Sequence, residues 1–173
     1  MITIEPLEQK YLEGAVVLNQ QTFPINYVDP RESIEASLDA EKLEKFQKKL
    51  VEELDEPRTR KFQYWVAVEK ETDKVVGTTG IYERVCDSLD LCWLAWYCVD
   101  PEYRGRGIGA LLLGFTLDWA RCKGMKKMML YTSTDPAEHR AHEMYIRRGF
   151  VINEDRERIP EGDYEIFFME CIL

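Results

Sequence analysis

The fold of this chain is decided by the stretch Val99-Asp100-Pro101-Glu102-Tyr103-Arg104-Gly105-Arg106-Gly107-Ile108-Gly109-Ala110. Glycines at 105, 107 and 109 free the backbone from side chains, so successive N–H groups can surround an anion. The start of a helix adds about half a positive charge there. Arg104 and Arg106 supply further charged donors. The stretch therefore predicts a loop that binds a pyrophosphate.

The segments on either side of this loop predict an α/β fold. Leu91–Val99 is apolar on both faces and predicts a central, covered strand, whereas 107–123 predicts a helix and 125–132 a strand parallel to the first. Further strands are expected at 1–5, 62–69, 75–85, 149–156 and 164–172, and further helices at 7–21, 30–54 and 136–147. Short turns between most of the strands predict a mixed, largely antiparallel sheet of about seven strands with about four helices, in a single domain spanning 1–173.

Composition excludes several classes of protein. The net charge of −9 argues against binding of nucleic acid or of an anionic membrane, and we expect a cytoplasmic protein because the start of the chain has no basic region followed by an apolar one. Five cysteines, without a C-x-x-C pair, predict neither a disulfide framework nor a structural zinc (Cys86, Cys92, Cys98, Cys122 and Cys171). Residues 101–150 carry nine basic and five acidic side chains, against 14 and 27 in the remainder. This asymmetry suits an anionic cofactor in one part and a cationic substrate in the other.

Two other phosphate-binding loops are compared with this stretch. A Walker loop is excluded because no G-K-[ST] follows. A dinucleotide fingerprint, G-x-G-x-x-[GA], is formally met by Gly105, Gly107 and Ala110, but it belongs at the first strand-helix turn of a parallel sheet. Here the loop follows antiparallel strands, and the next strand ends without an acidic residue. The context argues against a nicotinamide cofactor.

Two motifs resemble the GNAT superfamily of N-acetyltransferases. Arg104-x-x-Gly107-x-Gly109 resembles its [QR]-x-x-G-x-[GA] signature, and Ala141-His142-Glu143-Met144-Tyr145-Ile146-Arg147-Arg148-Gly149-Phe150 resembles its segment N-x-x-A-x-x-x-Y-x-x-x-G-F. Glu138 stands where the Asn of that segment usually stands. The resemblance implies a transferase that uses acetyl-CoA as co-substrate and no metal.

The resemblance also implies where the acetyl donor binds. In the family the fourth and fifth strands splay apart, and the pantetheine arm lies between them along the end of the fourth strand. Carried over to this chain, the cofactor-binding residues are Tyr97, Cys98, Val99, Arg104, Gly105, Arg106, Gly107, Ile108, Gly109, Ala110 and Glu138. The thioester then lies beside Cys98 and Val99, where a backbone N–H stabilises the oxyanion of a tetrahedral intermediate.

Two residues are expected to carry proton transfers. Tyr145 matches the residue that protonates the departing thiolate in many family members, and Glu83 is the candidate general base, with a water chain as the alternative. Cys98 has no histidine near it in sequence, so packing is preferred to covalent transfer. His139 and His142 lack a third ligand at a recognisable spacing and are expected on the surface.

The acceptor is predicted to be a primary amine, with small cationic amines or polyamines preferred. Phe23, Pro24 and Tyr27 lie in a segment that resembles the peptide-gripping loop of some protein N-terminal acetyltransferases, so a peptide N-terminus is the alternative. A noncatalytic acyl-CoA-binding or sensing module is the rival from another class. Family members are often dimers, so a homodimer is a possible partner.

Overall fold

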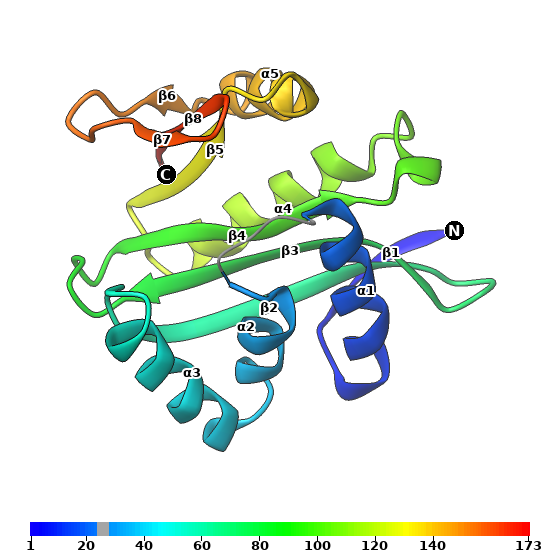
Figure 1. The fold of residues 1–173 in the computed structure, drawn as a ribbon. Coiled ribbons are helices and arrows are strands. Elements are labelled where there is room, and N and C mark those ends of the chain that lie inside the picture. Colours follow the sequence, from blue (N-terminus) through cyan, green and yellow to red (C-terminus); the bar gives the residue numbers. More distant parts are fainter. Residues whose placement is uncertain (24–27) are drawn as a thin grey trace.

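The central sheet of the protein has eight strands. The computed structural model describes residues 1–23 and 28–173 (Figure 1). The strands are β1 (Ile2–Pro6), β2 (Thr59–Glu69), β3 (Lys74–Arg84), β4 (Leu91–Val99), β5 (Lys127–Ser133), β6 (Val151–Ile152), β7 (Ile159–Glu161) and β8 (Tyr164–Ile172). Their order is β1-β2-β3-β4-β5-β8-β6, with β7 paired to β8, and β4–β5 is the parallel pair. The predicted mixed, largely antiparallel sheet is confirmed.

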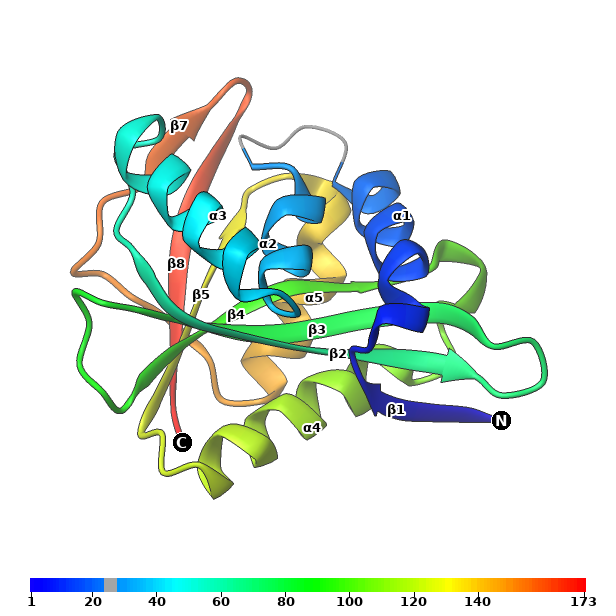
Figure 2. The same ribbon diagram turned by 90° about the horizontal axis from the view of Figure 1, so that it is seen from below.

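In the described part of the chain, five α-helices cover the two faces of this sheet. They are α1 (Leu12–Thr22), α2 (Pro30–Ala36), α3 (Ala40–Glu52), α4 (Ile108–Cys122) and α5 (His139–Arg147). Alternate residues of β2 point to opposite faces, because side chains alternate along a strand. Tyr64 and Val66 pack with α1 and α2, whereas Trp65 packs with α4. Figure 2 shows α1, α2 and α3 on the near side of the sheet and α4 on the far side.

The segment expected to form one helix from 30 to 54 is divided into α2 and α3. The division has a local cause, since the Asp39 carboxylate accepts hydrogen bonds from the backbone N–H groups of Glu41 (2.8 Å) and Lys42 (3.2 Å). Such a cap starts a new helix. Asp39 therefore separates the short α2 from the longer α3.

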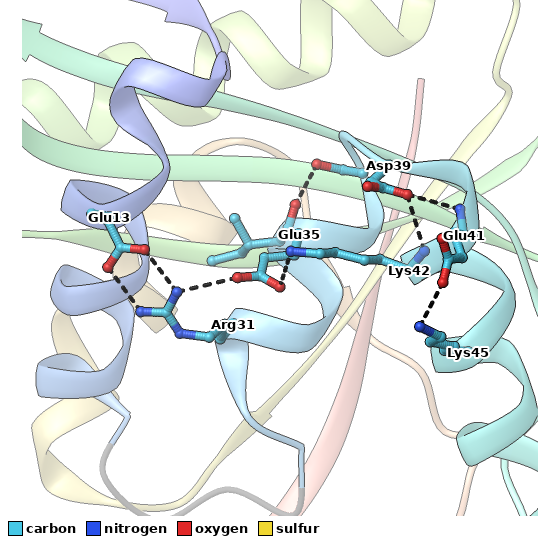
Figure 3. Close-up of polar contacts among 9 residues, drawn as sticks. Glu13, Arg31, Glu35, Asp39, Glu41, Lys42 and Lys45 are labelled. Atoms are coloured by element: carbon cyan, nitrogen blue, oxygen red, sulfur yellow. Dashed lines mark hydrogen bonds and ion pairs between the residues drawn. The ribbon is translucent and has the colours of Figure 1, made fainter.

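A chain of ion pairs fixes α2 between its neighbours (Figure 3). The Arg31 guanidinium donates to both carboxylate oxygens of Glu13 on α1, at 2.8 and 2.9 Å, and to Glu35 at 3.2 Å. Lys42 on α3 donates to the other oxygen of Glu35 at 2.6 Å. Arg31 and Glu35 thereby connect three helices on one face of the sheet.

The strand expected at 149–156 is shorter than predicted. β6 contains only Val151 and Ile152, which pair with Glu170 and Met169 of β8. The Asn153 side chain then accepts the N–H of Asp155 at 3.1 Å, a local turn that ends the strand. The chain returns as β7, next to β8.

The sheet opens between β4 and β5. Their pairing includes Leu91 with Lys127, Cys92 with Met128 and Trp93 with Met129, and no residue of β4 beyond Trp93 pairs with a described residue of β5. From there β5 continues along β8, away from β4 (Figure 1). The predicted splaying of the fourth and fifth strands is confirmed.

Candidate active site

A bulge in β4 lies beside the opening between β4 and β5. Thr78 is opposite Cys98 and Gly80 is opposite Ala95, so two residues of β4 face the single intervening residue of β3. Within this bulge Trp96 has a φ of +43°, which is rare for a bulky side chain. Such an outlier persists only where its surroundings hold it.

Three contacts hold Trp96 in this conformation. Its carbonyl oxygen accepts a 2.6 Å hydrogen bond from the Thr78 hydroxyl. Its indole N–H donates to the Ser33 hydroxyl at 2.6 Å, and its ring centroid is 5.6 Å from that of Phe23. The contacts come from β3, from α2 and from the residue that follows α1. The backbone of β4 at the opening is therefore fixed from outside the strand.

The glycine loop that the sequence predicts to bind an anion leads into the start of α4. Gly107 has a φ of +80° and precedes the first turn of the helix, which carries no acidic residue. Gly105 has a φ of +76°, and a Cβ at either glycine would meet no atom within 4 Å. Backbone conformation rather than space requires glycine at both positions. The free N–H groups of the first turn and the helix dipole suit a phosphate group.

Arg104 and Arg106 are both exposed beside this loop, but they contact the protein backbone. The Arg104 Nε donates to the carbonyl oxygen of Val99 at 3.1 Å, and Arg106 donates to that of Glu102 at 3.2 Å. Arg148 reaches the same helix from the end of α5 and donates to the carbonyl oxygen of Ala110 at 3.0 Å. Arg148 was not among the predicted site residues, although Arg148 lies within the second motif, residues 141–150.

Gly109 allows β4, α4 and α5 to approach one another. A Cβ on Gly109 would lie 2.8 Å from the Tyr97 hydroxyl and 3.2 Å from the terminal methyl of Met144. The Tyr97 hydroxyl donates to the Met144 sulfur at 2.9 Å. The third glycine of the loop therefore serves close packing, in contrast to the positive φ that Gly105 and Gly107 require.

Tyr145 lies on the face of α5 that packs against the sheet. Its ring centroid is 5.9 Å from that of Tyr97 and 5.7 Å from that of Phe150. Its hydroxyl makes no hydrogen bond to the described residues, and burial raises the pKa of the phenol far above its ordinary value. Tyr145 is consequently a protonated phenol with a free donor, next to Tyr97 of β4.

Cys98 is buried on the other face of β4, within a polar cluster. Its Sγ lies 3.2 Å from the Thr78 hydroxyl and 3.5 Å from the Asn19 amide oxygen. Burial raises the pKa of the Cys98 thiol. The protonated thiol is a poor nucleophile, which favours packing over covalent transfer.

Glu138 contacts the end of β5. Its carboxylate accepts hydrogen bonds from the Ser133 N–H at 3.0 Å, from the Ser133 hydroxyl at 2.9 Å and from the Thr132 hydroxyl. His142 Nε2 is 2.8 Å from the same Thr132 hydroxyl. His142 is half-buried, whereas the sequence predicted an exposed surface histidine. These bonds direct Glu138 to β5, where it holds the start of α5. The hydroxyl pair Thr132-Ser133 ahead of Glu138 was the signal in the sequence for this cluster.

Glu83 is not brought together with the other predicted site residues. It pairs with Lys61 of β2 and lies 3.5 Å from Arg60, beyond Tyr82, which is opposite Trp93. The bulge lies opposite the segment from Thr78 to Gly80, three to five residues away, which is about 10–16 Å along an extended strand. A carboxylate at that distance cannot take a proton from an amine at the bulge.

The predicted acceptor residues are only partly described. Phe23 follows α1 and packs on Trp96, whereas Pro24 and Tyr27 lie outside the described residues. The structure adds Ser33, and it adds Tyr64, whose buried hydroxyl has no hydrogen-bond partner among the described residues. Neither was singled out from the sequence, because one lies in a helix of ordinary composition and the other in an apolar strand.

The family follows from a match that includes the loop, the bulge and α5. The model of the "Acetyltransferase (GNAT) family" matches residues 31–150, well over half of the chain. The chain belongs to the acetyltransferase (GNAT) family. It is thus an acetyl-CoA-dependent N-acetyltransferase, which confirms the predicted family, enzyme class and acetyl donor. No curated protein sequence matches the chain significantly.

Solved structures of GNAT proteins share the whole fold. A GNAT-family acetyltransferase from Staphylococcus aureus Mu50 has a TM-score of 0.69 at 19% identity, with 100% of this chain and 99% of that chain covered. The ribosomal-protein-S18-alanine N-acetyltransferase of Escherichia coli has a TM-score of 0.69 at 17% identity, with coverages of 99% and 94%. The PaiA N-acetyltransferase of Thermoplasma acidophilum, in complex with coenzyme A, has a TM-score of 0.64 at 19% identity, with coverages of 100% and 99%.

Within residues 1–23 and 28–173, no three His, Cys, Asp or Glu side chains are grouped so that they could hold a metal ion. None of the helices in the described part of the chain has the length and apolar character needed to cross a membrane.

Proposed function

We propose that this enzyme transfers the acetyl group of acetyl-CoA directly to a primary amine at the β4 bulge. The observation that carries the proposal is the fixed backbone of Trp96 beside the opening between β4 and β5. An extended ligand in that opening can form backbone hydrogen bonds with the edge of β4 beyond Trp93, where β5 no longer pairs with it. In the attack, the amine nitrogen bonds to the acetyl carbon, a tetrahedral intermediate forms, and the carbon–sulfur bond then breaks.

The donor is proposed to be held at two places. The N–H groups at the start of α4, which follow Gly107, hold the pyrophosphate, as the absence of an acidic residue in the first turn favours. The backbone of Tyr97, Cys98 and Val99 holds the pantetheine arm and the thioester. A backbone N–H at this strand end is then placed to stabilise the oxyanion.

Tyr145 is proposed as the acid that protonates the departing thiolate. Its buried phenol keeps its proton, and its hydroxyl has no hydrogen bond to a described residue that would compete. The phenolate left after the transfer regains a proton from solvent. Tyr145 therefore acts at the donor end of the reaction.

The proton of the attacking amine is proposed to pass to water. A free alkylamine has a pKa of about 10, so it must lose a proton before or during the attack. Glu83 lies too far from the bulge to accept this proton. The side chains that hydrogen-bond to Trp96 are the hydroxyls of Thr78 and Ser33. These hydroxyls can order a water but are not bases at neutral pH.

The described residues around the bulge favour a peptide amine over a polyamine. Phe23 and Ser33 contact the Trp96 side chain, and neither is acidic. The preference for a cationic amine rested on charge totals, which do not locate charges in space. The E. coli enzyme of similar fold is named for a ribosomal protein's alanine, an acceptor of this kind.

Calorimetric titration followed by an activity panel tests the proposal. Acetyl-CoA is expected to bind saturably and NADH not to bind, and one class among peptides, polyamines and small amines is expected to release free thiol. Tyr145→Phe should slow transfer at least tenfold without weakening acetyl-CoA binding. Tyr164→Phe, at an exposed position of β8, is the matched control. Saturable binding without thiol release on any amine would instead indicate a noncatalytic acyl-CoA sensor.

A further inference from the structure

A row of aromatic rings crosses the face of the sheet on which α2 and α3 pack. Centroid distances are 5.6 Å for Phe46–Phe62, 6.2 Å for Phe62–Tyr82, 5.9 Å for Tyr82–Trp93 and 6.1 Å for Trp93–Phe168. The row leads from α3 across β2, β3 and β4 to β8. Trp93 is also the last residue of β4 that pairs with β5, so its ring marks the closed end of the opening.

Two arginines cover the Trp93 ring. The guanidinium carbon of Arg84 is 4.4 Å from the ring centroid, and that of Arg156 is 4.9 Å from it and 5.2 Å from the Phe168 centroid. The two cations therefore lie less than about 10 Å apart, in a protein whose net charge is −9. Like charges at this separation repel each other, so a bound anion between them would be stabilised.

Acidic side chains neutralise Arg84 more fully than Arg156. The Asp87 carboxylate accepts the Trp93 indole N–H at 2.7 Å and attracts Arg84. Arg84 has Glu56 at 3.8 Å and donates to the Tyr82 hydroxyl at 3.3 Å. Arg156 makes no hydrogen bond or ion pair with any residue that the structure describes. Its charge acts on Glu170, but the ion pair of Glu170 is with Lys127 at 3.0 Å. A guanidinium that lies over a ring keeps its in-plane N–H groups available, and these match a carboxylate.

We propose that Arg156, with Arg84, binds a carboxylate of the acceptor, so that the acceptor is a short peptide with an acidic group at a fixed distance from its amine. This inference rests on the proposed transfer to an amine at the bulge. From Trp93 to Cys98, β4 advances five residues, about 16 Å, a distance that four or five extended residues span. A free amino acid is too short to reach both places.

The test compares acceptors that differ in one charge. The probes are a five-residue, alanine-rich peptide amide with glutamate at its last position, the same peptide with glutamine there, its free-acid glutamine form, and spermidine. Free-thiol release gives kcat/KM for each. We expect kcat/KM of the wild-type enzyme to be about 10- to 100-fold higher for the glutamate peptide than for the glutamine amide, the range of a charge-assisted contact. The free-acid form then tells whether a terminal carboxylate serves as well as a side-chain one.

Two variants assign the effect to Arg156. Arg156→Gln should remove the preference for the carboxylate, so that kcat/KM for the glutamate peptide falls to that for the glutamine amide. Arg158→Gln is the matched control, because Arg158 is engaged by Glu165 at 3.2 Å and should keep the preference. Equal kcat/KM values for the glutamate and glutamine peptides with the wild-type enzyme would overturn the inference, whatever the variants do. A higher kcat/KM for spermidine than for either peptide would also overturn it. Absence of thiol release with every amine would overturn the proposed function instead.

Discussion

The Thr78 hydroxyl of β3 donates a 2.6 Å hydrogen bond to the carbonyl oxygen of Trp96, which lies in the bulge of the neighbouring strand β4. Thr78 is 3% exposed, so this bond is made away from water. It connects a rare backbone conformation to the neighbouring strand, and the position of the strand edge at the opening depends on it.

Removal of that hydroxyl should weaken both the fold and the activity. Thr78→Val leaves the Trp96 carbonyl without its buried donor, which should lower the free energy of unfolding by about 1–3 kcal/mol and reduce kcat. Thr116→Val is the matched control, since the Thr116 hydroxyl bonds to Thr79 at 2.7 Å on the α4 face. Urea unfolding and thiol release measure the two effects. A Thr78→Val enzyme with unchanged kcat would refute the role of this bond in positioning the strand.

Gly109→Ala should disturb the contact between α4 and Tyr97. The new Cβ would lie 2.8 Å from the Tyr97 hydroxyl, closer than van der Waals contact allows, so acetyl-CoA binding should weaken. In a Tyr97→Phe background the same change should cost less, because that hydroxyl is gone and Ala is favoured over Gly in helices by up to about 1 kcal/mol. Calorimetry on the four proteins of this double-mutant cycle gives the coupling. Equal losses in both backgrounds would show that Tyr97 is not the obstacle.

His142 should make the fold sensitive to mild acid. Burial lowers the pKa of His142 in the folded state, partly against the attraction of Glu138, while His139 adds repulsion. The unfolded chain therefore binds the proton more readily, and stability falls as the pH drops through about 6.5, the ordinary histidine value. The Tm of His142→Asn should decline less than that of the wild type between pH 7.5 and 5.5. His139→Asn should stay closer to the wild type than His142→Asn does, because it removes only the repulsion and not the buried imidazole. An identical decline in all three would exclude His142 as the cause.

Glu83→Gln should leave catalysis nearly unchanged. Glu83 lies near Arg60 and about 10–16 Å along β3 from the bulge, so kcat/KM should stay within about twofold of the wild type at every pH. A pH–rate profile on the best amine measures this. Loss of tenfold or more, with the acidic limb of the profile changed, would restore Glu83 as the general base.

The sequence predicted the elements that depend on local pattern. The apolar run Leu91–Val99 became β4 with the same bounds, and the glycine loop before α4 has the positive φ angles that its composition indicated. The helix break at Asp39 was missed because the apolar spacing continues across it, although an aspartate is a common helix start.

Contacts between distant segments were beyond the sequence analysis. Nothing in the order of residues shows that Ser33 meets Trp96, or that Arg156 meets Trp93, because such pairs depend on how the sheet and helices pack. Glu83 illustrates the opposite error. The sequence predicted that Glu83 lies near the end of a strand. Which end of that strand lies beside the opening depends on the register of β3 with β4, which the sequence does not show.

The short ladder between β4 and β5 has a consequence for hydrogen exchange. One group of strands, β1 to β4, meets the other, β5 to β8, through the pairs from Leu91–Lys127 to Trp93–Met129. Amide protons along the open edge of β4 should exchange early in the free protein, while those between β5 and β8 stay protected. A donor lying along that edge supplies the missing backbone partner, so its arrival should be recorded as new protection at the amides between Leu94 and Val99 that point into the opening.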